Sequence, residues 1–177
     1  YTSGQINEGP QGVVDFGDSF QRTFAWSYAG RTWSMAMKFY PDIYASYKER
    51  SRFREYDLFA SDPYDDELIK NVADALKQVG TENGVPAGEI PSFAASFVQS
   101  LPYTPDAVTT PFDEYPRFPY ETLYDDGGDC EDTSLLIASL LQELGYGVVL
   151  VVFDNHIGIG VQCSANVPGM SYLYNNK

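Results

Sequence analysis

The sequence is poor in cysteine, histidine and basic residues, and each shortage excludes a class of protein. Two cysteines among 177 residues are too few for a disulfide framework. A single histidine leaves the chain without the close ligand pairs of a structural zinc site. With 11 basic and 25 acidic residues, the formal net charge is −14, and such a surface repels nucleic acid and anionic membranes. No apolar run is long enough to span a bilayer, so we expect no membrane insertion.

The remaining composition is that of a folded domain. Hydrophobic residues make up 44% and aromatic residues 15% of the chain, and its length is sufficient for one packed core. Residues 1–19 are rich in Gly, Ser and Asp without periodicity and predict an N-terminal tail or lead-in, which leaves residues 20–177 as a single domain. Because the chain begins at Tyr1 without methionine, we expect an upstream segment to have been removed and the protein to be extracytoplasmic or at the cell surface.

The first elements are predicted by residue spacing alone. Aromatic residues and methionines alternate with small or polar ones over 20–28 and 33–39, which predicts a β-hairpin whose aromatic face packs on the core. A sugar-binding aromatic face is the alternative. Helical spacing then predicts helices over 41–50, 63–79 and 90–101, the second of them capped by Asp62. We expect the basic cluster Arg50, Arg52 and Arg54 to pair with nearby carboxylates.

The stretch Gly127-Gly128-Asp129-Cys130-Glu131-Asp132 carries the strongest functional signal. Apolar residues at helical spacing follow it as far as Leu144, so we expect a helix that begins at the cysteine with Asp129 as its N-cap. Free backbone N–H groups and the helix dipole stabilise a thiolate at that position. Cys130 is therefore a candidate nucleophile, with a small buried structural cysteine as the alternative.

His156 is the candidate partner of this cysteine. The apolar run 148–153 predicts a buried strand, followed by a two-residue turn and a second strand over 156–161. Alternation places His156, Gly158 and Gly160 on one face, where the glycines allow another group to approach closely. Cys163 falls on the opposite face, so we expect no disulfide between the two cysteines.

These features, together with Glu121-Thr122-Leu123, resemble the transglutaminase-like, papain-related superfamily, and most closely its bacterial and archaeal cysteine-peptidase-like branch. The resemblance covers about residues 93–163. It implies an α+β fold in which helices pack against an antiparallel β-sheet, with Cys130 as nucleophile and His156 as base. It also implies thiol-dependent acyl transfer on a protein or peptide substrate, which is hydrolysis in a cysteine peptidase and cross-linking in a transglutaminase. This chemistry requires no cofactor.

The chain departs from the family's pattern at the third polar residue, usually an Asp on the next strand. Here a predicted strand over 170–174 is followed by a turn and the end of the chain. Asn175 is a candidate for orienting the imidazole, with an ordinary turn asparagine as the alternative. We therefore expect either a domain truncated at its C-terminus or one without the acid. Gln99 is a candidate oxyanion donor together with the N–H of Cys130, with a solvent-facing glutamine as the alternative.

Acidic residues crowd the cysteine and suggest a cation site. Unpaired negative charges raise the pKa of a thiol, whereas a hard cation among them reverses the local field. The resemblance implies calcium at acids adjacent to the cysteine, and Asp129, Glu131 and Asp132 occupy those positions. Helix capping is the alternative for Asp129 and Asp132. A function of a different class follows as well: a non-catalytic acidic surface domain that binds calcium or a protein partner.

Overall fold

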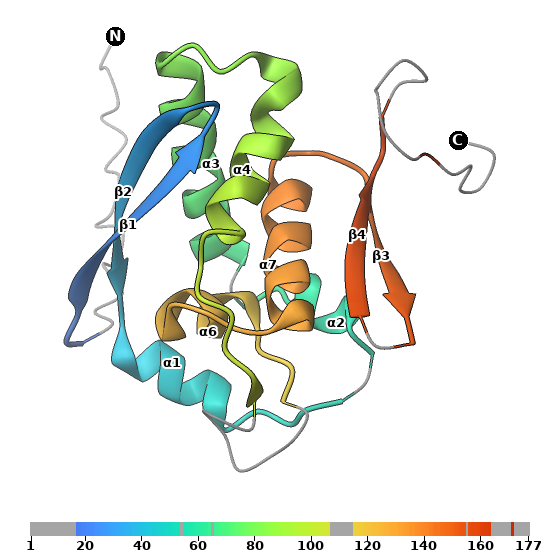
Figure 1. The fold of residues 1–177 in the computed structure, drawn as a ribbon. Helices are drawn as coiled ribbons and strands as arrows, with labels where there is room; N and C mark the ends of the chain where they lie inside the picture. The colour runs from blue at the N-terminus through green and yellow to red at the C-terminus, as the bar shows by residue number, and fades with distance from the viewer. Residues whose placement is uncertain are drawn as a thin grey trace, which may run out of the picture.

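Helices form the middle layer of this α+β molecule, with a β-hairpin on either side of them (Figure 1). The structure is a computed structural model, which describes residues 17–53, 55–64, 66–106, 115–154, 156–163 and 171. Over these residues, the strands form two separate two-stranded antiparallel sheets in place of the single sheet expected from the sequence. Most of the predicted lead-in and the predicted strand 170–174 lie outside the described residues.

The N-terminal hairpin is the one predicted from alternation. Strands β1 (Phe20–Tyr28) and β2 (Arg31–Phe39) pair with Trp26 opposite Trp33. Both indole rings pack on Phe93 of helix α4 (Ile90–Val98), with centroid separations of 5.5 and 4.7 Å. Packing of the aromatic face on the core is thus confirmed, since large apolar surfaces are most stable when removed from water.

The helices predicted over 41–50 and 63–79 form with shifted ends, as α1 (Pro41–Lys48) and α3 (Asp66–Glu82). Also present are α2 (Asp57–Ala60), the 3₁₀ turn η1 (Ala87–Glu89) and α6 (Pro119–Asp125). The expected cap Asp62 is wrong, because α3 begins at Asp66 and the buried Asp62 carboxylate instead accepts two hydrogen bonds from Arg50. Arg52 binds Glu121, so the predicted pairing of the basic cluster is confirmed for two members. Arg54 lies outside the described residues.

Helix α7 (Cys130–Glu143) runs through the centre of the molecule and begins at the predicted residue. Its apolar residues from Leu135 to Leu141 are buried. Two buried serines fix its neighbours: Ser139 Oγ donates to the Ala60 carbonyl of α2 at 2.6 Å, and Ser134 Oγ donates to the Ile157 carbonyl at 2.8 Å. These bonds satisfy polar groups that would otherwise be costly to bury.

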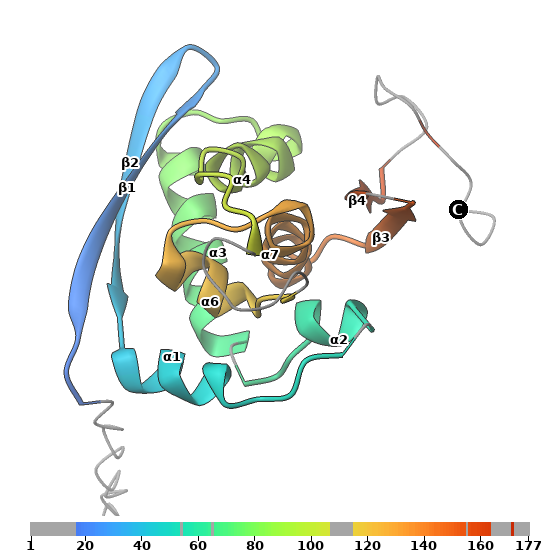
Figure 2. The ribbon, with the colours of Figure 1, turned by 60° about the horizontal axis from the view of Figure 1, so that its bottom comes forward.

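The C-terminal hairpin is formed by β3 (Val148–Phe153) and β4 (His156–Val161), which pair with Phe153 opposite His156. Figures 1 and 2 show it at the side of the molecule next to α7. The expectation of a buried β3 is wrong: Val152 is 63% and Phe153 58% exposed, because the described residues supply no layer on the outer side. Over the same residues, no helix combines the length and apolar character needed to cross a membrane.

Candidate functional site

The turn that presents Cys130 is fixed by a short stretch that follows α4. Tyr103 forms a parallel bridge with Gly128; the Thr104 N–H donates to the Gly128 carbonyl at 2.9 Å, and the Gly128 N–H donates to the Pro102 carbonyl at 3.3 Å. A Cβ atom at Gly127 would lie 2.5 Å from the Pro102 oxygen. Glycine is therefore required there by close backbone approach, which explains one half of the Gly-Gly pair in the sequence.

Cys130 is the first residue of α7, as the sequence predicts. Asp129 is the N-cap, and its N–H donates to the Asp132 carboxylate at 3.2 Å. The Thr133 hydroxyl donates to the Asp129 carbonyl at 2.8 Å and closes the first turn. Cys130 itself is partly exposed, so a reagent or substrate can approach the thiol.

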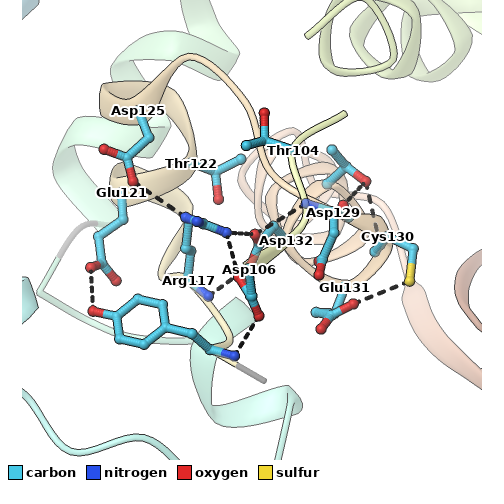
Figure 3. A network of polar contacts seen from close by, with 12 residues as sticks. Thr104, Asp106, Arg117, Glu121, Thr122, Asp125, Asp129, Cys130, Glu131 and Asp132 are labelled. Carbon is cyan, nitrogen blue, oxygen red and sulfur yellow. Dashed lines mark hydrogen bonds and ion pairs between the residues drawn. The ribbon is translucent and has the colours of Figure 1, made fainter. Parts of the chain in front are cut away.

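The thiol has an acidic partner in this arrangement. Cys130 Sγ donates a hydrogen bond to Glu131 Oε2 at 3.1 Å (Figure 3). Burial and then the contact with Glu131 raise the pKa of the Cys130 thiol, while the backbone amide of Ile157 acts in the opposite direction. Burial and the acidic neighbours therefore outweigh this amide, because each disfavours the thiolate.

Strand β4, which begins at His156, lies next to α7, but the imidazole faces away from the thiol. Ile157 is 5% exposed and faces α7, so strand alternation turns the exposed His156 ring to the other side of the hairpin, where it stacks near Phe153 with centroids 6.3 Å apart. No hydrogen bond joins Cys130 to His156 in the described part of the chain. The structure thus brings the backbone of β4, rather than the imidazole, to the thiol.

Against the first turn of α7 lies a buried cation that sequence reasoning missed. The Arg117 side chain is 1% exposed and binds Asp106, Asp132 and, at 3.3 Å, Asp125 (Figure 3). Its backbone N–H also donates to Asp132 at 2.7 Å. Burial alone would lower the pKa of Arg117, but the three carboxylates raise it. Neither Arg117 nor Asp106 belongs to a recognisable sequence motif, because the two residues are separated in sequence and come together only when the chain folds.

Asp129 differs from its acidic neighbours because part of its carboxylate has no partner. It is 9% exposed, and its Oδ1 accepts no hydrogen bond from the described residues. Burial, followed by the neighbouring Glu131 and Asp132, raises its pKa to about 8. A buried carboxylate without a donor is costly to ionise, and an external cation relieves that cost.

The expected calcium ligands divide into two groups. One oxygen each from Asp129 and Glu131 lies within 4.8 Å of the other and of Cys130 Sγ; a second group of the same spread joins Asp106, Asp129 and Asp132. Arg117 already binds the carboxylates of Asp106 and Asp132. Asp129 and Glu131 therefore fit a hard cation better than Asp132 does, since among the described residues no basic side chain pairs with their carboxyl groups.

The other predicted site residues are less informative. Gln99 is the exposed C-cap of α4, and within the described residues its side chain makes no hydrogen bond to the cysteine turn. Asn175 lies outside the described residues. A hollow of about 280 Å³ lies between β2, α3 and α6, and another of about 340 Å³ between α2, α7 and β3. Cys130 lines neither hollow.

Comparisons with protein-family models, curated proteins and solved structures find no match for this chain. The resemblance to the transglutaminase-like superfamily therefore rests on the sequence of the cysteine turn and of the hairpin alone, and these comparisons neither support nor contradict it.

Proposed function

We propose that this domain is a thiol-dependent acyl-transfer enzyme with Cys130 as nucleophile. Of the two activities of this kind, we propose a cysteine peptidase before a transglutaminase. The observation that carries the proposal is the position of the thiol: it is partly exposed at the N-terminus of α7 and meets the backbone amide of Ile157, the residue next to His156. A helix N-terminus and a backbone amide both favour the thiolate, which is the reactive form, and they oppose the burial and the Glu131 contact that raise the pKa of the thiol.

In the proposed mechanism, Cys130 Sγ attacks a peptide or side-chain amide carbonyl. His156 takes the thiol proton and later returns it to the leaving amine, so its ring has to come within about 3 Å of Sγ in the reacting complex. The N–H of Cys130, with Gln99, is proposed to hold the oxyanion, and Asn175 to orient the imidazole. Water then releases a peptidase product from the acyl-enzyme, whereas an amine releases a transglutaminase product. We propose a protein or peptide substrate in an extracytoplasmic or cell-surface location.

Turnover of a fluorogenic peptide library by the wild type and two cysteine variants tests this function. We expect Cys130→Ala to lose turnover by at least about 10³-fold, because the covalent step is removed. Cys163→Ala, at the exposed cysteine of the same chain, is the matched control and should keep its activity. His156→Ala should lower turnover by about 10²–10⁴-fold. Turnover that survives in Cys130→Ala would refute the proposal.

The unpartnered Asp129 Oδ1 favours a second candidate function, which is calcium binding at the cysteine turn with or without catalysis. Asp129 and Glu131 would hold the ion, and Asp106 offers a further oxygen within reach of Asp129. A bound cation supplies positive charge that stabilises neighbouring anions. Catalysis by Cys130 requires no metal in this scheme, so the two functions are separable.

Thermal unfolding with calcium and with chelator tests the second function. A ligand that binds only the folded state stabilises it by about 2.7 kcal/mol at a hundredfold excess over Kd. We therefore expect calcium to raise the Tm of the wild type but not that of Asp129→Asn. Asp74→Asn, at an exposed acid of α3, is the control and should respond like the wild type. An equal response of Asp129→Asn would exclude the site.

A further inference from the structure

Tyrosine rings beside carboxylates repeatedly hold a cation in this protein. The Arg52 guanidinium lies over the Tyr115 ring, 4.4 Å from its centroid, and binds Glu121 at 2.8 Å. Arg50 lies over the Tyr64 ring at 5.0 Å, although that ring is 80% exposed. A positive group is stabilised in such places twice, by the electron-rich face of the ring and by the nearby negative charge.

Tyr103 has the same acidic surroundings and no such cation. Its ring is 70% exposed. Desolvation and then the negative charges of Asp129, Cys130 and Glu131 raise the pKa of its phenol. Among the described residues, no arginine or lysine lies over this ring, in contrast to Tyr64. Tyr103 therefore has an exposed aromatic face whose cation-binding capacity is unused, on a segment whose backbone pairs with the cysteine turn.

The position of Tyr103 relative to the thiol is fixed by the backbone. Tyr103 pairs with Gly128, two residues before Cys130, and the flanking hydrogen bonds are the ones that hold the cysteine turn. The ring is thus carried by an ordered segment while its face remains open to solvent. A group that is already in place loses little entropy when a ligand binds.

The carboxylates next to the thiol supply the charge for such a site. Asp129 is nine-tenths buried, and within the described residues its Oδ1 has no hydrogen bond. Glu131 is 7% exposed, accepts a hydrogen bond from Cys130 Sγ and lies next to the Asp129 carboxyl group, and in that part of the chain neither acid forms an ion pair with a basic residue. We infer that Tyr103, with the carboxylates of Asp129 and Glu131, binds a cationic side chain of the substrate next to the acyl group that Cys130 attacks. The substrate class is therefore a basic peptide, with lysine or arginine beside the reacting carbonyl. This inference rests on the proposed function of Cys130.

Two thiol reagents of different charge test the inference without a known substrate. Methyl methanethiosulfonate is neutral, and its trimethylammonioethyl analogue carries a quaternary ammonium group. Each reacts with a thiolate to form a mixed disulfide and release methanesulfinate, so no external oxidant is needed. The rate at Cys130 is measured in Cys163→Ala and the rate at Cys163 in Cys130→Ala, both with chelator. The cationic-to-neutral rate ratio cancels the fraction of thiolate at each site.

We expect this ratio to be about tenfold higher at Cys130 than at Cys163, because the acidic surroundings concentrate a cation. Tyr103→Leu should lower the ratio at Cys130 by about two- to fivefold, while Tyr103→Phe, which keeps an aromatic face, should retain it. Tyr64→Leu, at the exposed tyrosine that Arg50 already covers, is the matched control and should have no effect. These variants separate the contribution of the ring from that of the carboxylates.

The outcomes distinguish failure of the inference from failure of the proposed function. Equal ratios at Cys130 and Cys163, or a ratio that Tyr103→Leu leaves unchanged, would overturn the inference while Cys130 remained an accessible nucleophile. A Cys130 that fails to react with the neutral reagent, under conditions where Cys163 reacts, would contradict both. A higher ratio that falls only when the ring is removed supports the cationic subsite.

Discussion

Asp129 and Asp132 lie three residues apart in the first turn of α7, and both are buried, but only Asp132 has a cation of its own. Its carboxylate binds the side chain and the backbone of Arg117, whereas Asp129 Oδ1 has no partner. Burial raises the pKa of both acids, to about 6 for Asp132, where Arg117 opposes the shift, and to about 8 for Asp129. Asp132 is therefore neutralised inside the protein by Arg117, whereas Asp129 forms no ion pair within the part of the chain that the structure describes, so two buried acids of one turn differ in what compensates their burial.

Removal of Arg117 should produce the largest loss of stability, because it leaves the buried Asp132 carboxylate without a cation to pair with. We expect Arg117→Met to lower the free energy of unfolding by about 3–5 kcal/mol, the usual cost of an uncompensated buried charge. Urea unfolding measures the change. Lys70→Met is the control, because its pair with Asp74 is exposed to solvent and its loss should leave stability nearly unchanged. Equal losses in Arg117→Met and Lys70→Met would show that the buried ion pairs of Arg117 contribute no more to stability than an exposed pair.

The same substitution at the two aspartates sharpens the contrast directly. Asp132→Asn removes the negative charge that Arg117 requires, so we expect a loss of about 2–3 kcal/mol. Asp129→Asn keeps an N-cap side chain and removes a carboxylate whose oxygen has no donor, so unfolding should change by less than about 1 kcal/mol in either direction. Denaturant midpoints of the two variants, measured side by side, decide this. A larger loss in Asp129→Asn would reverse the roles assigned to the two acids.

A smaller effect on stability is expected at high pH, from the buried phenol of Tyr115. Burial, followed by Glu121, raises the pKa of Tyr115 to about 12. Tyrosines of the unfolded chain ionise near pH 10, so the unfolded state loses this proton first. The stability due to the neutral phenol is therefore complete below about pH 10 and is lost between about pH 10 and 12.

Unfolding measured at pH 9 and 11.5 tests this expectation. The wild type should lose about 1–2 kcal/mol over the interval from this group, and Tyr115→Phe should lose less, because it has no phenol to ionise. Tyr64→Phe, at an exposed ring, is the control and should follow the wild type. A pH dependence that Tyr115→Phe leaves unchanged would contradict the assignment.

Local sequence patterns were sufficient for the elements that pack by one regular face. The N-terminal hairpin and the start of α7 were predicted correctly, because alternation, helical spacing and the cap before Cys130 act over a few residues. The apolar strand β3 was placed correctly along the chain but wrongly in the core. An apolar run predicts a strand without saying which neighbours cover it, and Val152 and Phe153 are exposed.

The candidate site was predictable only in part, for a related reason. Asp129, Cys130 and Glu131 are adjacent in sequence, so their proximity follows from a single turn. Arg117 and Asp106 reach the same place from outside that turn, and their contacts depend on the whole fold. The alternation that identified His156 as a candidate base also predicts that it faces opposite to Ile157, and the burial of Ile157 against α7 is a tertiary fact.

The hydrogen bond from the Ser134 hydroxyl to the Ile157 carbonyl bears on the order in which parts of the molecule unfold. The C-terminal hairpin is a two-stranded sheet with an exposed outer strand, and such units open more readily than a central helix. We expect amide hydrogens of β3 and β4 to exchange with solvent long before those of α7. Each such opening separates the backbone amide of Ile157 from Cys130 while the helical core persists, so the thiol loses this contact more often than α7 unfolds.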